Sequence, residues 1–380
     1  MEKHILFNKK KVSKAVSHVA DLCSKQKSML PILDCVLFDV KDNTFTVTGS
    51  NLDTRFIVSD ELASPSENTR FCINGNDIKK VLSSISDETV EFVLVSEGML
   101  ANIIHSNGTV SLPIFSAKEY PDFKNIGDKC SFDISSDKLK DIVNNSRNFL
   151  GNDELRPNIG GLFISINGNT MEYCATDTHV LITGSVNASN LNDKVSSIII
   201  NKTALQPIIS MCGMSENVHV DIYSSTAEFS VGNNIVQLTG IQGNYPNFKA
   251  VIPNAEAGKY EKVYNVGRND MLSSLKRVSV STGENKLIAM EFSGDNLQIS
   301  STNIDFGKRT VDNIKCESVG HDINGLRFGI NYSNLQTCLS VFSSDTIKMV
   351  TDRPNKAILF IDEENHPSRT VLAMPMMLND

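Results

Sequence analysis

The sequence contains no apolar run close to the ~18 residues that a membrane-spanning helix needs. Its N-terminus, MEKHILFNKKK, holds a three-residue apolar patch, which is too short for the core of a secretory signal peptide. The composition, 40% apolar and 21% charged, is typical of a globular protein, and we expect a cytoplasmic one. At roughly 100–200 residues per domain, 380 residues predict two to four domains.

Patterns typical of metal sites and of common catalytic sites are also missing. The eight cysteines include no Cys-x-x-Cys pair, and the seven histidines do not cluster with them, which argues against a zinc site. We therefore expect buried, reduced thiols, no metal and no other cofactor. The sequence has neither a glycine-rich phosphate loop nor a paired-carboxylate signature.

One stretch nevertheless resembles a catalytic site. Thr176, Asp177 and His179 lie within four positions, with Cys174 close by, which is a possible nucleophile, acid and base. Neighbouring residues of a strand point to opposite faces, so such a group cannot assemble from adjacent positions. We therefore expect a structural turn with side-chain hydrogen bonds to local backbone, no catalytic residue, and a protein that is not an enzyme.

The same stretch belongs to an internal repeat. The sequence FDVKDNTFTVTGSNLD (38–53) matches FISINGNTMEYCATDTH (163–179) and MEFSGDNLQISSTNID (290–305) in its strand-like runs and its turn. A step of 126 residues relates three triplets: Ser50, Thr176 and Thr302; Asn51, Asp177 and Asn303; and Asp53, His179 and Asp305. YPDF (120–123) recurs as YPNF (245–248). The chain therefore reads as three similar units.

Each unit also contains two amphipathic segments that predict helices. They cover residues 8–22, 76–86, 136–149, 201–212, 268–281 and 331–342, and several begin at Asn, Ser or Asp, which are good N-caps. Pro207 must lie in the first turns of its helix or kink it. With roughly eight strands per unit, we predict an α+β fold of three tandem domains, at residues 1–127, 128–254 and 255–380.

Charge is distributed unevenly between these helices and the rest of the chain. The six helical segments hold 13 Lys or Arg and 5 Asp or Glu, whereas the remainder holds 23 and 39, so the net charge of −8 conceals a basic helical layer. Basic residues on one surface suit a phosphate backbone and give affinity without base readout. The simpler alternative is that charged residues occupy the solvent-facing sides of the helices.

Seven motifs together resemble the bacterial beta sliding clamps, the beta subunits of DNA polymerase III. They are LPIL (30–33), SNLD (50–53), YPDF (120–123), RPNIGGLF (156–163), ATDTHVL (175–181), NYPNFKAVIP (244–253) and VLAMPMML (371–378). The resemblance covers the whole chain. It implies three DNA-clamp domains per chain and a head-to-tail homodimeric ring, with helices lining the hole and sheets outside. Such a ring encircles duplex DNA without reading its sequence and raises the processivity of the polymerase by tethering it.

The resemblance also implies the partners and the site residues. The clamps bind the polymerase III catalytic subunit, the clamp loader and other clamp-binding-motif proteins through a peptide-binding pocket. The matching pocket positions are Ile159, Thr176, His179, Leu181, Pro246, Val251, Leu372, Met374, Pro375 and Met376. Candidate DNA contacts are Lys25, Lys27, Lys79, Lys80, Lys138, Lys140, Arg147, Lys202, Lys276 and Arg277. The dimer interface is expected to pair a strand with Val110 and Leu112 against one with Val278 and Val280.

Two positions depart from the family pattern. Met377 stands where the family commonly has Arg, which predicts a more apolar pocket, and Asn76 stands where relatives often have a basic residue. A repeat-built protein-interaction scaffold that does not encircle DNA is the alternative function, and the negative net charge permits it.

Overall fold

The computed structural model describes residues 2–23, 30–153, 155–192, 194–253, 262–319, 326–351, 353–362, 364–365 and 368–378. The chain forms two compact units. The first comprises Met1–Val143, Ile166–Asn169 and Ala188–Gln242, and the second Asn144–Ser165, Thr170–Asn187 and Gly243–Asp380. No described helix has the length and apolar character to cross a membrane.

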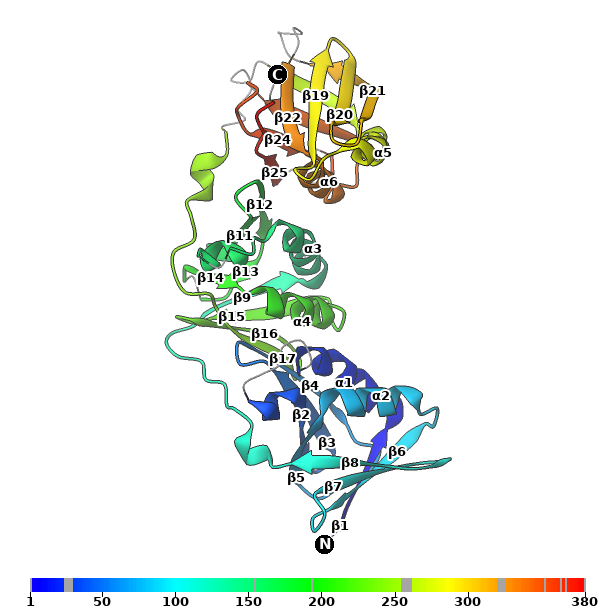
Figure 1. The fold of residues 1–380 in the computed structure, drawn as a ribbon. Coiled ribbons are helices and arrows are strands. Elements are labelled where there is room, and N and C mark those ends of the chain that lie inside the picture. The colour runs from blue at the N-terminus through cyan, green and yellow to red at the C-terminus, as the bar shows by residue number, and fades with distance from the viewer. Residues whose placement is uncertain are drawn as a thin grey trace. The chain divides into compact units, whose positions relative to one another are not determined.

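The first unit is built on a 13-stranded antiparallel sheet in the order β1-β6-β7-β8-β5-β2-β3-β4-β17-β16-β15-β9-β13 (Figure 1). Helices α1 and α2 pack on each other, and α1 lies against β3 and β4. The elements of this unit are β1 (Glu2–Asn8), α1 (Lys9–Cys23), β2 (Cys35–Lys41), β3 (Thr44–Ser50), β4 (Thr54–Glu61), β5 (Thr69–Asn74), α2 (Gly75–Ser84), β6 (Thr89–Val95), β7 (Leu100–His105), β8 (Gly108–Phe115), β9 (Cys130–Ser135), α3 (Ser136–Ser146), β13 (Ser189–Asn190), β14 (Ser196–Ile200), α4 (Lys202–Cys212), β15 (Asn217–Ile222), β16 (Thr226–Val231) and β17 (Asn234–Thr239).

The second unit contains a sheet that runs β10-β11-β12-β25-β24-β23-β18-β21-β20-β19-β22. Helix α5 packs on β20 and β21, and α6 packs on β22 and β25. The elements of this unit are β10 (Leu162–Asn167), β11 (Thr170–Thr176), β12 (Val180–Asn187), β18 (Lys262–Gly267), α5 (Arg268–Val278), β19 (Leu287–Ser293), β20 (Asn296–Asn303), β21 (Lys308–Ser318), β22 (Leu326–Asn331), α6 (Tyr332–Ser340), β23 (Thr346–Thr351), β24 (Ile358–Ile361) and β25 (Arg369–Ala373).

The six predicted helices are confirmed, and asparagine starts four of them. The side chain of Asn8 accepts a hydrogen bond from the amide of Lys11 (3.1 Å). Asn74, Asn201 and Asn331 cap α2, α4 and α6 in the same way. An unpaired amide at a helix start is costly, and the short Asn side chain satisfies it without entering the helix. Pro207 lies inside α4, as the sixth residue of the helix.

The repeated turn is a side-chain-to-backbone motif, as predicted. Asn51 accepts a hydrogen bond from the amide of Thr54 (2.9 Å), and Asp177 accepts one from the amide of Val180 (2.8 Å). In both copies the next residue has a left-handed backbone, with φ of 79° at Leu52 and 80° at Thr178. The same Asx geometry therefore joins β3 to β4 and β11 to β12.

The third copy of this turn is longer. Asn303 accepts a hydrogen bond from the amide of Phe306 (3.3 Å), and the left-handed residue is Gly307, with φ of 61°. The repeat thus conserves the role of the Asx residue while the loop that follows it differs.

The YP-x-F repeat has a structural explanation as well. Tyr120 is buried and donates a hydrogen bond to the carbonyl oxygen of Thr48 (3.2 Å). Tyr245 donates one to the carbonyl oxygen of Cys174 (3.3 Å), which is the position equivalent to Thr48 in the next repeat. In each copy the tyrosine lays its ring on the sheet and satisfies its hydroxyl against a strand backbone.

Candidate functional site

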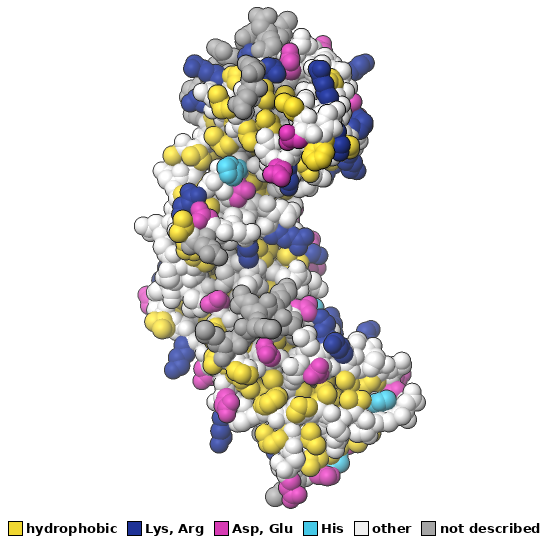
Figure 2. Space-filling model, in the orientation of Figure 1, with side chains coloured by type: hydrophobic (Ala, Val, Ile, Leu, Met, Phe, Trp, Pro, Cys, Tyr) yellow, Lys and Arg dark blue, Asp and Glu magenta, His cyan; other side chains and the backbone are white. Residues whose placement is uncertain are grey.

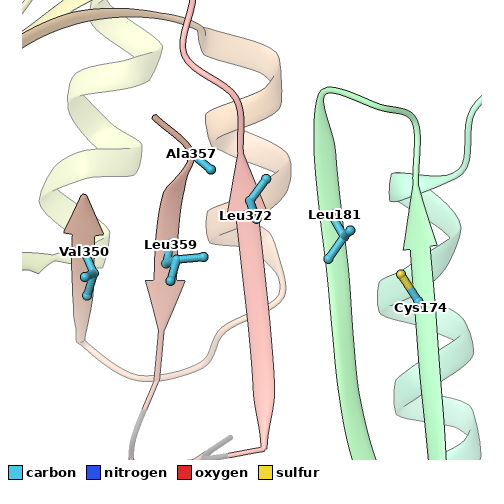
Figure 3. Close-up of a cluster of buried hydrophobic side chains, with 6 residues drawn as sticks. All are labelled: Cys174, Leu181, Val350, Ala357, Leu359 and Leu372. Atoms are coloured by element: carbon cyan, nitrogen blue, oxygen red, sulfur yellow. The ribbon is translucent and has the colours of Figure 1, made fainter. Parts of the chain in front are cut away.

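A buried apolar cluster lies where β12 pairs with β25 in the second unit. Leu181 and Leu372 are directly opposite each other across this pairing. The cluster, here called the β12–β25 cluster, consists of Cys174, Leu181, Val350, Ala357, Leu359 and Leu372 (Figure 3). Antiparallel pairing places these side chains on one face, because opposite residues of paired strands point the same way.

Aromatic residues from two other segments pack on this cluster. Phe163 of β10 stacks on Tyr245 with ring centroids 4.8 Å apart, and the Phe248 ring lies 6.0 Å from that of Phe163. Ile252 also packs on the cluster. The segment 245–252 therefore covers part of an apolar sheet surface, and hydrophobic side chains are visible on the exterior of this unit (Figure 2).

Polar groups at the edge of the cluster are few. Lys249 forms an ion pair with Glu172 (2.7 Å), and its ammonium lies 6.0 Å from the centre of the Phe248 ring. The side chain of Asn158 donates a hydrogen bond to the carbonyl oxygen of Asn244 (2.8 Å), which ties the 157–160 turn to the covering segment. The described part of this edge is thus mainly apolar, with one neutralised charge pair.

The C-terminal segment after β25 is fixed by backbone hydrogen bonds on both sides. The amide of Met374 donates to the carbonyl oxygen of His179 (2.8 Å). The amide of Met376 donates to the carbonyl oxygen of Gly329 (2.7 Å), and the Gly329 amide returns a bond to Met376 (3.2 Å). A Cβ on Gly329 would lie 2.8 Å from the Met376 oxygen, so only glycine permits this approach.

The apparent catalytic group does not assemble. The hydroxyl of Thr176 donates to the carbonyl oxygen of Val180 (2.7 Å), and Asp177 is occupied by backbone amides. Burial raises the pKa of the Cys174 thiol to about 12, so it stays protonated and is a poor nucleophile. The described residues contain no group of three or more His, Cys, Asp or Glu side chains that could hold a metal ion.

The predicted pocket residues all belong to the second unit, but they differ in exposure. Leu181 and Leu372 lie in the cluster, whereas His179 is exposed and 39% of Met374 is accessible. Val251 is 56% exposed on the covering segment. The others are Ile159 and Thr176, which are buried, Pro246, which is exposed, and Pro375 and Met376, which are half-buried.

Sequence reasoning missed much of the surroundings of these residues. Val350 and Leu359 of the cluster lie on β23 and β24, and no sequence motif indicated them. Tyr245 and Phe248 were visible as a repeated motif, yet the repeat did not reveal that they pack on the cluster. Gly329 also carried no local signal, because its role depends on a segment almost 50 residues later in the chain.

The candidate DNA contacts differ in burial and in the ion pairs that they form. Lys25 and Lys27 lie outside the described residues. Lys79 pairs with Asp21 (2.5 Å), and two nitrogens of Arg277 contact Asp312 (2.5 and 3.0 Å). The remaining candidates are exposed: Lys80 on α2, Lys138 and Lys140 on α3, Arg147 just after α3, Lys202 at the start of α4 and Lys276 on α5.

Helix α1 carries further exposed cations that are not among the candidate DNA contacts. Lys10 and Lys14 are exposed on α1, four residues apart and therefore on one side of the helix. Lys11, by contrast, forms an ion pair with Asp60 (2.7 Å). The lysines of α1 were counted among the basic residues of the helical segments. Helical periodicity alone does not show which of them forms an ion pair and which are exposed.

One half of the expected dimer interface needs correction. Val278 is the last residue of α5 and is completely buried, so it lies on no strand and offers no surface to another chain. Val280 is 67% exposed, but it lies in the 3-10 turn Ser279–Ser281. The strand expected here came from the family resemblance, whereas the helical pattern over 268–281 agrees with the structure, in which α5 continues into a tighter turn.

Strands β8 and β21 each contain a stretch that pairs with a neighbour on one side only. Among the described residues, positions 108–113 of β8 pair only with β7. Positions 308–315 of β21 pair only with β20, and its last residues pair with β18. Val110 and Leu112 of β8 are half-buried, and Val311 of β21 is 42% exposed.

Three family models match consecutive parts of the chain. They describe the N-terminal, central and C-terminal domains of the DNA polymerase III beta subunit and match residues 3–124, 133–247 and 249–377. Among curated proteins, the beta sliding clamp of Haemophilus influenzae is 21% identical over 98% of this chain and 99% of its own length. The beta sliding clamp of Pseudomonas aeruginosa is also 21% identical, over 99% of this chain and 100% of its own.

Solved structures agree in fold. The P. aeruginosa sliding clamp bound to griselimycin superposes with a TM-score of 0.91 at 18% identity, covering 100% of both chains. The Thermotoga maritima DNA polymerase III beta subunit gives a TM-score of 0.90 at 19% identity, covering 99% of this chain and 100% of that one.

Proposed function

Because the chain belongs to the family of DNA polymerase III beta subunits, it is a non-catalytic processivity factor, and we propose that it acts as a homodimeric ring around duplex DNA. Partners would be tethered to the ring through the β12–β25 cluster and the C-terminal segment beside it. Tethering raises the effective concentration of a polymerase at its template without any new chemistry. The proposed place of action is the cytoplasm, and no cofactor is required.

The domain boundaries remain those expected from the repeat, at residues 1–127, 128–254 and 255–380. The three family segments support this division, since each falls largely within one of the proposed domains. The Asx turn recurs once in each proposed domain, and the YP-x-F motif recurs near the ends of the first two.

The ring proposal rests on two unpaired strand edges. Edge strands present unsatisfied backbone groups that readily pair with another chain. We propose that β8 of one protomer pairs with β21 of the partner, with Val110 and Leu112 near Val311 and the exposed Val280. Sedimentation should give a dimer of about 84 kDa, twice the chain mass of 41.8 kDa. A monomer at micromolar concentration would contradict the proposal.

The test of encirclement is retention on circular DNA. Clamp loaded onto nicked circular DNA by a clamp loader should stay bound through gel filtration and be lost when the circle is linearised. Retention that ignores linearisation would instead support a scaffold that binds without encircling.

Duplex DNA would be held by phosphate contacts from the helices. Replacing the exposed pair Lys138 and Lys140 by Ala should weaken DNA association and lower the salt slope by roughly one unit per lost contact. Lys41→Ala on strand β2 serves as the matched control. Replacing Lys25 and Lys27 is expected to weaken loading in the same salt-dependent way, and a wild-type salt slope would remove them from the contact set.

The partner site is supported by one observation above the others: an apolar cluster flanked by exposed, adaptable methionine. Such surfaces suit short linear peptides, because apolar anchors supply affinity while a few polar groups fix orientation. The probe is a fluorescein-labelled peptide carrying the clamp-binding motif of the polymerase III catalytic subunit. Griselimycin, which is bound in solved relatives from Pseudomonas aeruginosa and Bartonella birtlesii, is the competitor. Equal peptide affinity in wild type and Leu372→Ala would contradict the assignment.

A further inference from the structure

A cavity of about 630 Å³ opens in the first unit, remote in sequence from the β12–β25 cluster. It lies where β1, β5, β6 and the end of β8 come together beside the 96–99 turn. Its lining residues are Lys3, Thr69, Arg70, Phe71, Leu94, Ser96, Met99, Ile114, Phe115, Ser116, Ala117 and Lys118. The volume falls within the range of about 300–1,000 Å³ that is usual for ligand pockets.

The cavity connects to the aromatic core of the unit. Phe71 is buried and stacks on Phe38, with ring centroids 5.0 Å apart and planes only 4° from parallel. At the entrance the apolar side chains are accessible instead: Met99 is 47% exposed and Phe115 is 45% exposed. Accessible apolar side chains above a buried aromatic floor favour burial of an apolar group from a partner.

The charge of the lining has one sign. Lys3, Arg70 and Lys118 are its charged residues, and none of the residues that line the cavity is acidic. Arg70 contacts Asp39 (3.2 Å), and Lys3 lies 3.9 Å from Glu67. Lys118 is exposed on the turn that follows β8. Among the described side chains, Lys118 is therefore the lining cation that forms no ion pair, and it is complementary to an anionic group at the entrance.

The backbone holds Met99 at the entrance. Met99 has a φ of 48°, in the left-handed region that favours glycine. Its carbonyl oxygen accepts a hydrogen bond from the amide of Ile114 (2.8 Å), which fixes the turn against β8. The entrance is thus a defined structure rather than a loose loop, and the Met99 methyl group is a natural reporter of occupancy.

We propose that this cavity is a second docking site, for a segment of a partner protein that places an apolar side chain next to a carboxylate. The apolar side chain enters between Met99 and Phe115, and the carboxylate is held by Lys118. The site is separate from the β12–β25 cluster, and it does not depend on ring formation. A partner that occupied both sites would gain affinity by being held at two points.

The test uses the full-length chain with methyl-13C-labelled methionine. The probes are three capped peptides: Ac-Glu-Phe-Glu-Gly-NH2, the same peptide with Lys in place of Glu, and the same peptide with Ala in place of Phe. Met99→Leu assigns the cavity reporter, and Met374→Leu assigns the reporter of the other site. The acidic aromatic peptide is expected to shift the Met99 methyl signal in a saturable way and to leave Met374 unchanged.

Charge reversal sharpens the test. Lys118→Glu should weaken binding of the acidic peptide at least fivefold, whereas Lys124→Glu, an exposed lysine outside the lining, should leave it within twofold. The proposal is overturned if Met99 does not respond at millimolar peptide, if the lysine or alanine peptide binds equally well, or if only Met374 responds. Equal weakening by both lysine variants would also overturn the proposal, because long-range electrostatic attraction between the protein and the acidic peptide would explain that result without a local contact.

Discussion

Replacing Gly329 with alanine should weaken partner binding without touching the partner. The new Cβ would lie 2.8 Å from the carbonyl oxygen of Met376 and 2.8 Å from a methyl group of Leu287. The leucine side chain can rotate away, but the oxygen can retreat only if the C-terminal segment moves. Met374 and Pro375 lie on that segment, so the partner site loses its fixed wall.

The size of the effect follows from the two hydrogen bonds between Gly329 and Met376. Each hydrogen bond contributes roughly 1 kcal/mol net. Losing both therefore removes about 1–2 kcal/mol of the free energy that holds the C-terminal segment in place. If peptide binding must restore that order, the affinity falls by about 5- to 30-fold, since 1.4 kcal/mol is a factor of ten.

Fluorescence anisotropy with the labelled clamp-binding peptide measures this loss. Gly283→Ala is the matched control, because its Cβ would meet only the side chain of Asn285 at 3.6 Å. A methyl-13C signal of Met376 that moves in Gly329→Ala, with far-UV circular dichroism unchanged, would show that the segment alone has shifted. Unchanged peptide affinity together with a shifted Met376 signal would refute the reasoning.

Three further outcomes are expected. His179→Ala and Met374→Ala should each weaken the labelled peptide by about 1–3 kcal/mol in the same anisotropy assay if each is a binding hot spot, and unaltered affinity in both would mean that the site is elsewhere. Tyr245→Phe should lower the free energy of urea unfolding by roughly 1 kcal/mol, because it removes the bond to the Cys174 carbonyl. Tyr332→Phe, at a half-buried tyrosine, is the control and should leave the free energy of unfolding nearly unchanged. Burial, with a smaller contribution from Lys14, lowers the pKa of His18, so the unfolded chain binds a proton that the folded chain does not. The free energy of unfolding should therefore fall as the pH drops through about 6.5, and His18→Gln should reduce that fall between pH 8 and pH 5.5; an identical pH dependence would exclude His18 as its source.

Local patterns predicted the helices well, because their information is local. The apolar spacing in α1 and the asparagine caps at Asn74, Asn201 and Asn331 depend on neighbours within one or two turns. The strand expected at Val278 came from the family resemblance instead, and it is wrong, because Val278 is the last residue of α5.

The partner site, by contrast, could not be predicted from local sequence patterns. Family resemblance indicated Leu181 and Leu372, but neither periodicity nor spacing shows that they are opposite each other across a strand pair. Val350, Leu359 and Gly329 were not predicted, because their roles come from strands that meet only after the chain has folded. The exposed cations raise the same difficulty: Lys10 and Lys11 are adjacent in sequence, yet only Lys11 forms a described ion pair with Asp60.

The sequence by itself determined the threefold repeat, its two helices per unit and the Asx turn, since each rests on hydrogen bonds and apolar contacts between residues close in the chain. It also determined that the thiols would be buried, and all eight are. Only the tertiary structure decided which apolar residues form one surface, which cations are already neutralised, and which glycine holds the C-terminal segment. Those properties depend on distances between residues far apart in the chain, and such distances are set by sheet register and packing rather than by local preference.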